Sequence, residues 1–431
     1  MPEYKVNVDQ LREGVFIRLE STGWFDHPFL FSSFKITKPE QINILKKLGI
    51  AEVICIPEKS DVFPISQKQV PKPDMKPIAP QNDPDMHKLL EVKRERIARM
   101  NNRRERDELC DKNFQKSVSE VKNVMRGIES GSQEAFEESN QLMKSIVESL
   151  MPEKESAVQL MNTKFGKENV FFHSLNVSVL SMMLGREHGL DAEELRMLGL
   201  AALFHDIGKS RIPKSILHKE SPLTRAEWTF YQIHPKYGVE ILSKIDKFPP
   251  EALQAVYQHH EQNDGQGFPL KLDSPKISLF AKIISIVNVY DNHCNNRNPQ
   301  HSLSPHGALA YMFRSEKDRF DADLLAMFIQ CLGVYPPGTI VQLSNGIIGM
   351  VLSVNPNDPL HPSLMIYNHE IPKKEALIFD MSEEPSFRIE HSLLPSQLTQ
   401  EVYDYLSPRT HVTYYVAEGE QKPGKLSDLR K

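Results

Sequence analysis

Residues 165 to about 333 consist of apolar stretches that repeat with the period of an α-helix, and this feature constrains the fold more than any other. The stretches are 177–184, 192–203, 224–245, 250–257, 277–289 and 306–331. The strict alternation of a half-buried strand is almost absent here. The pattern therefore predicts an all-α domain over residues 165–334.

The N-terminal part predicts a smaller unit of another kind. Four short apolar runs favour strands, at 4–8, 15–19, 29–31 and 52–56. Between the last two runs, an apolar stripe follows Pro39 and stops at Gly49, which is typical of one helix. Residues 1–63 are therefore predicted to form a small α+β module.

Prolines separate this module from the next segment. Pro71, Pro73, Pro77 and Pro80 stand among polar residues, and proline cannot donate a backbone hydrogen bond, so residues 64–86 are predicted to be a linker. Residues 87–164 are nearly free of Gly and Pro and rich in Glu, Lys, Arg and Met, which favours long helices. Such a helical connector joins a sensory module to an output module or forms the seam of a homodimer, and the sequence leaves both open.

The C-terminal part changes pattern after the run Tyr335-Pro336-Pro337-Gly338. Short apolar runs at 340–343, 347–354 and 364–367, with a turn at 344–346, favour strands. Residues 335–431 are therefore predicted to be a small β-rich unit with a poorly packed tail. The whole chain is predicted to be a mainly α multidomain protein.

Composition excludes several classes of protein. With 40% hydrophobic and 25% charged residues among 431, the chain is neither fibrous nor wholly disordered. A formal charge of -5 argues against binding to DNA. The start of the sequence lacks a signal peptide, no run reaches the roughly 18 apolar residues of a membrane span, and the four cysteines form no CxxC pair. We therefore predict a cytoplasmic protein without membrane insertion.

Histidines indicate the chemistry, because ten of the sixteen fall in the predicted helical domain. His205 and Asp206 follow the apolar run 200–204, and a buried carboxylate is costly unless a cation or hydrogen bonds compensate. Gly208 then supplies a turn whose backbone a ligand can approach closely, and Lys209 supplies a cation suited to a phosphate oxygen. Residues 259–269 add two imidazoles and a loop punctuated by glycine. Together these features predict a site for metal and phosphate.

This set of motifs resembles the HD-GYP proteins, a branch of the HD metal-dependent phosphohydrolases. The matching residues are His173, His205-Asp206-Ile207-Gly208-Lys209, His234-Pro235 and the loop 259–269. Residues 4–60 are similar to the small domain of unknown function that often precedes HD-GYP domains in bacteria. The resemblance implies an HD-type helical fold and hydrolysis of the bacterial second messenger cyclic di-GMP to pGpG or GMP.

The resemblance also implies roles for individual residues and for cofactors. The family's metal-ligand positions fall on His173, His205, Asp206, His234, His259, His260 and Asn288. Its catalytic positions fall on Asp206 and Lys209, and its substrate-binding positions on Lys209, Arg297, Gly265, Gly267 and Phe268. The implied cofactors are two divalent metal ions, Fe or Mn, which suit histidine-rich ligation. The implied partners are cyclic di-GMP and proteins such as diguanylate cyclases, which would dock on the loop from Gly265 to Pro269.

Three positions depart from the family pattern. Asn288 replaces a metal-binding aspartate, and a neutral amide binds a divalent ion more weakly than a carboxylate does. Asp291 lies three residues on, and we do not assume that it restores this ligand. Phe268 replaces a tyrosine, and Asn169 stands where three-metal members carry glutamate. These changes favour a two-metal site or an impaired one.

Three functions therefore stay open from the sequence. The first is an active cyclic di-GMP phosphodiesterase. The second is a catalytically weak or inactive HD-GYP protein that binds cyclic di-GMP or docks a partner. The third is an enzyme that hydrolyses a different nucleotide or phosphate ester.

Overall fold

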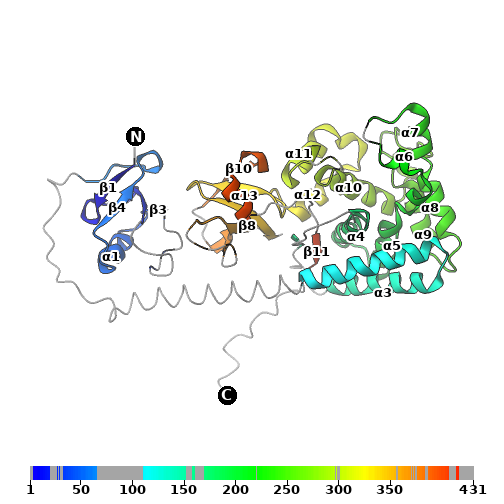
Figure 1. Ribbon diagram of the computed structural model, residues 1–431, viewed down its shortest axis with the longest axis horizontal. Helices are drawn as coiled ribbons and strands as arrows, with labels where there is room; N and C mark the ends of the chain where they lie inside the picture. Colours follow the sequence, from blue (N-terminus) through cyan, green and yellow to red (C-terminus); the bar gives the residue numbers. More distant parts are fainter. Residues whose placement is uncertain are drawn as a thin grey trace, which may run out of the picture. The chain divides into compact units, whose positions relative to one another are not determined.

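A computed structural model describes most of the chain. The described residues are 3–19, 27, 29, 33–65, 110–151, 158–160, 169–219, 221–296, 298, 301–355, 358–369, 371, 373, 376–383, 387–406 and 414–416. They form a small N-terminal sheet module, a central helical domain and a C-terminal sheet (Figure 1). The predicted fold class is confirmed. Most of the predicted linker, the first part of the connector and Arg297 lie outside the described residues.

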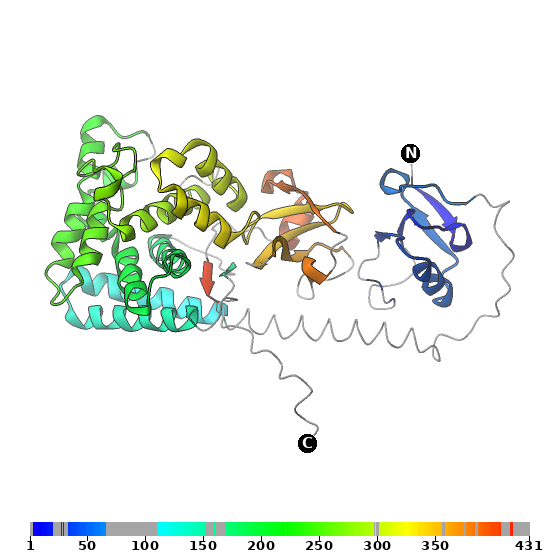
Figure 2. The same ribbon diagram turned by 180° about the vertical axis from the view of Figure 1, so that it is seen from behind.

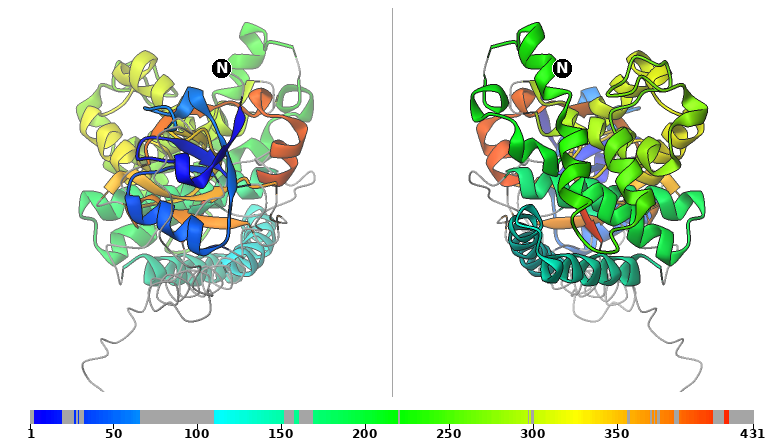
Figure 3. Two further views of the ribbon diagram at one scale, coloured as in Figure 1. Left: turned by 90° about the vertical axis from the view of Figure 1, so that its left-hand side faces the viewer. Right: turned by 90° about the vertical axis from the view of Figure 1, so that its right-hand side faces the viewer.

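The N-terminal module is a four-stranded antiparallel sheet of order β1-β4-β2-β3 with one helix (Figure 3, left). Its elements are β1 (Tyr4–Asn7), β2 (Phe16–Arg18), β3 (Ser33–Lys35), α1 (Pro39–Lys47) and β4 (Glu52–Cys55). Ile17, Phe34 and Leu45 are buried together in its core. The third strand was predicted at 29–31, but the structure has it at Ser33–Lys35, and residues 30–32 lie outside the described part.

The central domain is helical, as predicted. Its helices are α3 (Gln133–Leu150), α4 (Asn169–His188), α5 (Ala192–Phe204), α6 (Lys214–Leu217), α7 (Arg225–Tyr231), α8 (His234–Leu242), α9 (Pro250–Gln258), α10 (Leu279–Cys294), α11 (Pro305–Ser315) and α12 (Ala322–Leu332). A further helix covers 110–129. Among the described residues, no helix is long and apolar enough to cross a membrane.

Helix α4 lies at the centre of this domain and packs against α5, α10 and α12. Its apolar side chains are buried on several faces, as expected for a helix surrounded by other helices. Helix α3 runs along one side, beside α4 and α5 (Figures 1 and 2), and buries an apolar face that includes Phe136 and Met143. Helix α9 in turn packs against α5 and α8, so these helices and α4 form one packed unit.

Two long apolar stretches divide where the sequence pattern suggested continuity. The stretch 224–245 breaks between α7 and α8, because Pro235 stands in the first turn of α8 and cannot continue a helical hydrogen-bond ladder. The stretch 306–331 breaks between α11 and α12, where the side chain of Asp321 caps α12 by accepting from the backbone N–H of Leu324. The first break brings His234 to the start of a helix.

The C-terminal unit contains a five-stranded antiparallel sheet of order β10-β6-β7-β8-β9. Its strands are β6 (Ile340–Leu343), β7 (Ile348–Asn355), β8 (Asp358–Ile366), β9 (Leu377–Asp380) and β10 (Ile389–Leu393), followed by α13 (Gln400–Leu406). Gly346 supplies the positive φ of the predicted turn between β6 and β7. Within the predicted helical connector, the structure has one short strand, β5 (Val158–Leu160), which pairs with β11 (Tyr414–Val416).

Candidate metal centre

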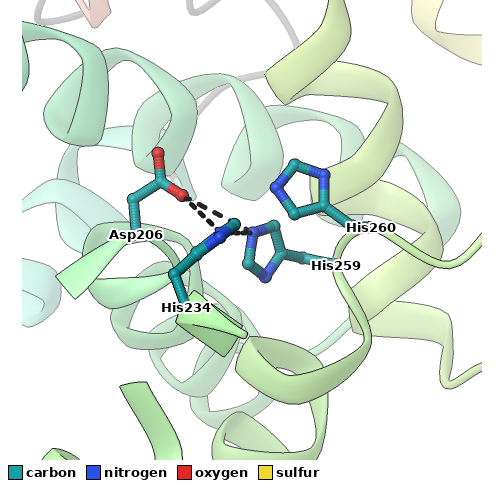
Figure 4. Close-up of side chains that lie close together, drawn as sticks. All are labelled: Asp206, His234, His259 and His260. Atoms are coloured by element: carbon teal, nitrogen blue, oxygen red, sulfur yellow. Dashed lines mark hydrogen bonds and ion pairs between the residues drawn. The ribbon is translucent and has the colours of Figure 1, made fainter. Parts of the chain in front are cut away.

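Polar side chains from four parts of the helical domain meet at one place. His173 comes from α4, His205 and Asp206 follow α5, His234 begins α8, and the pair 259–260 follows α9. They form two groups in which the candidate ligand atoms lie within 4.8 Å of one another. One group is Asp206, His234, His259 and His260 (Figure 4), and the other is His173, His205 and Asp206. Six of the seven predicted metal ligands are thus brought together.

Asp206 belongs to both groups because its two carboxylate oxygens face different histidines. Oδ1 lies 3.2 Å from His234 Nε2 and 3.6 Å from His259 Nε2. Oδ2 lies 3.3 Å from His205 Nε2 and 3.7 Å from His173 Nε2. Since the carboxylate is buried and stands between the two sets of rings, it is placed to serve both halves of the centre.

Hydrogen bonds fix which ring nitrogen of each histidine faces the centre. Three rings use Nδ1 to reach a backbone carbonyl three residues earlier: His205 with Ala202 at 2.7 Å, His234 with Tyr231 at 2.8 Å, and His259 with Val256 at 2.7 Å. A carbonyl oxygen only accepts, so Nδ1 carries the hydrogen and the lone pair of Nε2 points into the centre. This arrangement is the one that metal-binding histidines adopt.

The converging lone pairs show that the residues fit a divalent cation. His173 Nε2 lies 3.2 Å from His205 Nε2, and His234 Nε2 lies 3.4 Å from His259 Nε2. Asp206 Oδ1 and His260 Nε2 are buried without a hydrogen-bond partner among the described residues. Each such atom costs about 1–3 kcal/mol when it is left unsatisfied. A bound cation would satisfy these acceptors and remove their mutual repulsion.

The charge states also suit a metal. Burial lowers the pKa of His205, His234, His259 and His260, so these imidazoles are neutral at neutral pH. Burial alone would raise the pKa of Asp206, but the charge of Lys209 holds it well below the usual value. Neutral imidazoles and an ionised carboxylate are the forms that bind divalent metals.

Asp291 on α10 lies behind His173 and orients it. The Nδ1 atom of His173 donates to Asp291 Oδ2 at 2.5 Å, while the amides of Asn176 and Asn295 donate to Oδ1. The carboxylate therefore contacts the side of the ring opposite Nε2, and both of its oxygens are engaged by donors. Sequence reasoning missed Asn176, although its spacing of three residues from His173 placed both on one face of a helix.

Asp291→Asn is expected to weaken metal binding about 10- to 100-fold, the usual range for losing a residue that orients a metal ligand. The introduced amide would have to present a donor either to His173 or to Asn176, both of which already donate. Metal titration of the purified variant measures the effect. Asp323→Asn, at an exposed carboxylate on α12, is the control and should bind metal as the wild type does. Equal affinity in Asp291→Asn would contradict the orienting role.

Asn288 is buried on α10, and its amide oxygen accepts a hydrogen bond from Asn292 at 2.7 Å. The backbone carbonyl of Asn288 accepts from the same amide at 2.8 Å. The structure thus gives Asn288 a partner outside the histidine groups, and its role as a metal ligand stays a prediction. The predicted phosphate contact Arg297 lies outside the described residues.

The loop after His260 is held by a residue that sequence reasoning did not single out. Glu261 is buried, and its two oxygens accept from the backbone N–H groups of Leu270 at 2.6 Å and Leu272 at 2.8 Å. A Cβ at Gly267 would lie 2.4 Å from the backbone nitrogen of Gln262, so only glycine fits there. The sequence feature that could have indicated this role is the position of the carboxylate, directly after two histidines.

Lys209 lies in the 3-10 helix η6 (Ile207–Arg211), where its Nζ donates to Asp206 Oδ2. Burial alone would lower the pKa of Lys209, but the carboxylate of Asp206 raises it, so the side chain is charged.

The neighbouring Gly208 has another role than the predicted one. The sequence predicted that this glycine lets a phosphate approach the backbone closely. Its missing Cβ makes room for α8, because a Cβ there would lie 2.0 Å from the backbone oxygen of His234.

Comparison with known proteins agrees with this geometry. The HD domain family matches residues 141–324, and the domain of unknown function DUF3391 matches residues 3–158. The second match extends beyond the module predicted to end at residue 63.

Three curated relatives illustrate the likeness. Cyclic di-GMP phosphodiesterase PA4108 of Pseudomonas aeruginosa is 26% identical over 84% of this chain and 84% of its own length. The cyclic di-GMP phosphodiesterase response regulator RpfG of Xanthomonas campestris is 33% identical over 34% of this chain and 39% of its own. The 3'3'-cGAMP-specific phosphodiesterase 3 of Vibrio cholerae is 32% identical over 38% of this chain and 35% of its own length. The chain therefore carries an HD domain with an N-terminal DUF3391 domain, and it is similar to proteins that include HD-GYP cyclic di-GMP phosphodiesterases.

Proposed function

We propose that this protein hydrolyses the phosphodiester bonds of cyclic di-GMP to pGpG or GMP with two divalent metal ions, Fe or Mn. The observation that carries the proposal is Asp206, one buried carboxylate whose two oxygens face two sets of imidazole lone pairs. The activity of the relatives supports the choice of a cyclic dinucleotide. The histidine-rich donor set favours Fe or Mn over Mg.

The residues that would hold the metal ions are those of the two groups around Asp206. Divalent ions bound there would polarise the phosphodiester and lower the pKa of the attacking water. Asp206 contributes the only negative charge within the two groups. Lys209, held beside it as a cation, would contact a phosphate oxygen and balance the charge that gathers there.

The loop from Gly265 to Pro269 contacts one of the candidate ligands through Phe268. Phe268 stacks on the ring of His260, with centroids 4.4 Å apart and planes at 25°. The backbone N–H of Phe268 also donates to the carbonyl of His260 at 3.1 Å. Because the loop is fastened directly to a candidate ligand, we infer that Gly265, Gly267 and Phe268 shape the place where the substrate enters. A protein such as a diguanylate cyclase could dock on the same loop.

The decisive experiment is hydrolysis by protein reconstituted anaerobically with Fe(II) or Mn(II). Cyclic di-GMP and 3'3'-cGAMP are supplied in parallel, because relatives with either named substrate match this chain. Chromatography should show pGpG or GMP from cyclic di-GMP, and chelated protein should form neither. Faster hydrolysis of 3'3'-cGAMP would overturn the substrate assignment.

Asn288 supports a second candidate, a weak or inactive effector that binds cyclic di-GMP. Its amide oxygen is engaged by Asn292 and carries no charge, so this position contributes less to metal binding than an aspartate would. Retained binding of cyclic di-GMP without linear product, in metal-loaded protein, would select the effector over the enzyme.

Asn288→Asp is expected to bind metal about tenfold more tightly and to turn over faster, because it adds a carboxylate ligand. Elemental analysis after dialysis and the initial rate of hydrolysis measure the two effects. Asn43→Asp, at an exposed asparagine on α1 of the N-terminal module, adds the same charge outside the helical domain and serves as the control. Unchanged metal content in Asn288→Asp would show that position 288 is not a ligand.

A further inference from the structure

An exposed tryptophan lies beside the candidate metal centre. Trp228 on α7 is 45% exposed, although tryptophan is usually well buried. Its ring stacks on Tyr231, with centroids 5.5 Å apart and planes at 13°, and it meets Phe268 edge-on at 6.0 Å. We call Trp228, Tyr231 and Phe268 the aromatic platform.

The platform connects directly to the candidate ligands. Phe268 stacks on His260, and the ring of Tyr231 lies 5.0 Å from that of His234. Lys209 Nζ lies 5.5 Å from the centre of the Tyr231 ring. The exposed indole is therefore separated by a single ring from each of two candidate ligands.

Core packing does not account for the position of Trp228. Helix α7 buries none of its residues, so the tryptophan does not anchor this helix in the hydrophobic core. An exposed indole leaves a large apolar surface in water, which is unfavourable unless a ligand covers it. Aromatic side chains arranged beside a phosphate site are a common way to stack a nucleobase.

We propose that the aromatic platform is a base-binding subsite, in which a guanine base of the substrate stacks on Trp228 while the phosphate lies at the candidate metal centre. The platform thereby selects base-bearing nucleotides over simple phosphate esters. Stacking is sequence-tolerant, because every base has a π-face, so the platform supplies affinity for a base without reading its edges. This inference rests on the proposed function for the position of the phosphate.

Fluorescence tests the stacking itself, because the chain has only two tryptophans, Trp24 and Trp228. In metal-loaded Trp24→Phe protein, Trp228 is the sole indole reporter. GMP should quench its emission in a saturable way, whereas ribose 5-phosphate, which lacks a base, should not. No quenching by GMP, or equal quenching by both compounds, would overturn the subsite.

Kinetics test the contribution of the platform to substrate binding. Trp228→Ala should raise the KM for cyclic di-GMP about tenfold, the size of effect expected from losing one base–aromatic stack, and leave kcat within about twofold. Trp228→Phe should restore most of the affinity. Phe313→Ala removes a comparably exposed ring from α11 and should change neither constant.

Metal content separates a subsite from a purely structural role. If Trp228 only supported Phe268 and His260, Trp228→Ala would lose metal, and that result would count against the proposal. The fluorescence titration with GMP needs no turnover. Quenching by GMP without hydrolysis of cyclic di-GMP would therefore refute the proposed enzyme while supporting the subsite.

Discussion

Asp206→Asn is expected to lower metal content to below one ion per chain and to reduce hydrolysis of cyclic di-GMP by about a thousandfold or more. The exchange keeps the size of the side chain but removes the one negative charge in both groups of candidate ligands. It also leaves the Nζ of Lys209 without the carboxylate that it contacts. Elemental analysis and product chromatography measure the two effects.

Asp273→Asn is the matched control, because this carboxylate is exposed and pairs only with the surface residue Lys276 among the contacts described. It should leave both metal content and rate unchanged. A circular dichroism melt of both variants verifies that each is folded. Full metal content in folded Asp206→Asn would rule out a shared carboxylate at the centre.

Gly208→Ala is expected to lower the free energy of unfolding by about 3 kcal/mol, at the upper end of the usual cost of overpacking. A Cβ there would lie 2.0 Å from the backbone oxygen of His234 and 2.4 Å from the backbone nitrogen of Gly238. Backbone atoms cannot swing aside as a flexible side chain can, so η6 and α8 must move apart. That movement would separate Asp206 from His234, and metal content should fall with stability.

Gly307→Ala provides the comparison in urea unfolding. Gly307 lies in the first turn of α11, where a Cβ would meet only the side chains of Ser304, at 3.0 Å, and Leu303. Its free energy of unfolding should stay within about 1 kcal/mol of the wild type. A Gly208→Ala protein as stable as Gly307→Ala would show that the close approach to α8 is easily relieved.

Much of the candidate site could be predicted from the sequence, because its residues stand at recognisable chain positions. His205 and Asp206 end an apolar helix, and the pair 259–260 precedes a loop rich in glycine. The sequence could not show that Asp206 faces both groups, since this depends on how α5, α8 and α9 pack. The role of Asp291 was hidden for the same reason, because its partner His173 is 118 residues away.

An element of the fold was predictable where its own residues carry the pattern. It was not predictable where it depends on pairing with a strand far along the chain. The strands β6 and β7 follow from two short apolar runs and the turn between them. The strand β5 does not, because its partner β11 lies more than 250 residues further along the chain. The platform around Trp228 was also missed, since an isolated tryptophan on a short helix resembles an ordinary core residue until its exposure is known.

The Nδ1 hydrogen bonds of His205, His234 and His259 have a consequence for how the centre is built. Their acceptors are carbonyls in the last turn of α5, α7 and α9, where helix geometry supplies no intrahelical partner. Each histidine side chain therefore satisfies a carbonyl at the C-terminus of a helix. Asparagine, whose amide nitrogen can reach the position of Nδ1, would keep this hydrogen bond and remove the candidate ligand, whereas alanine removes both. The same three side chains thus combine a helix-end hydrogen bond with a candidate metal-ligand atom.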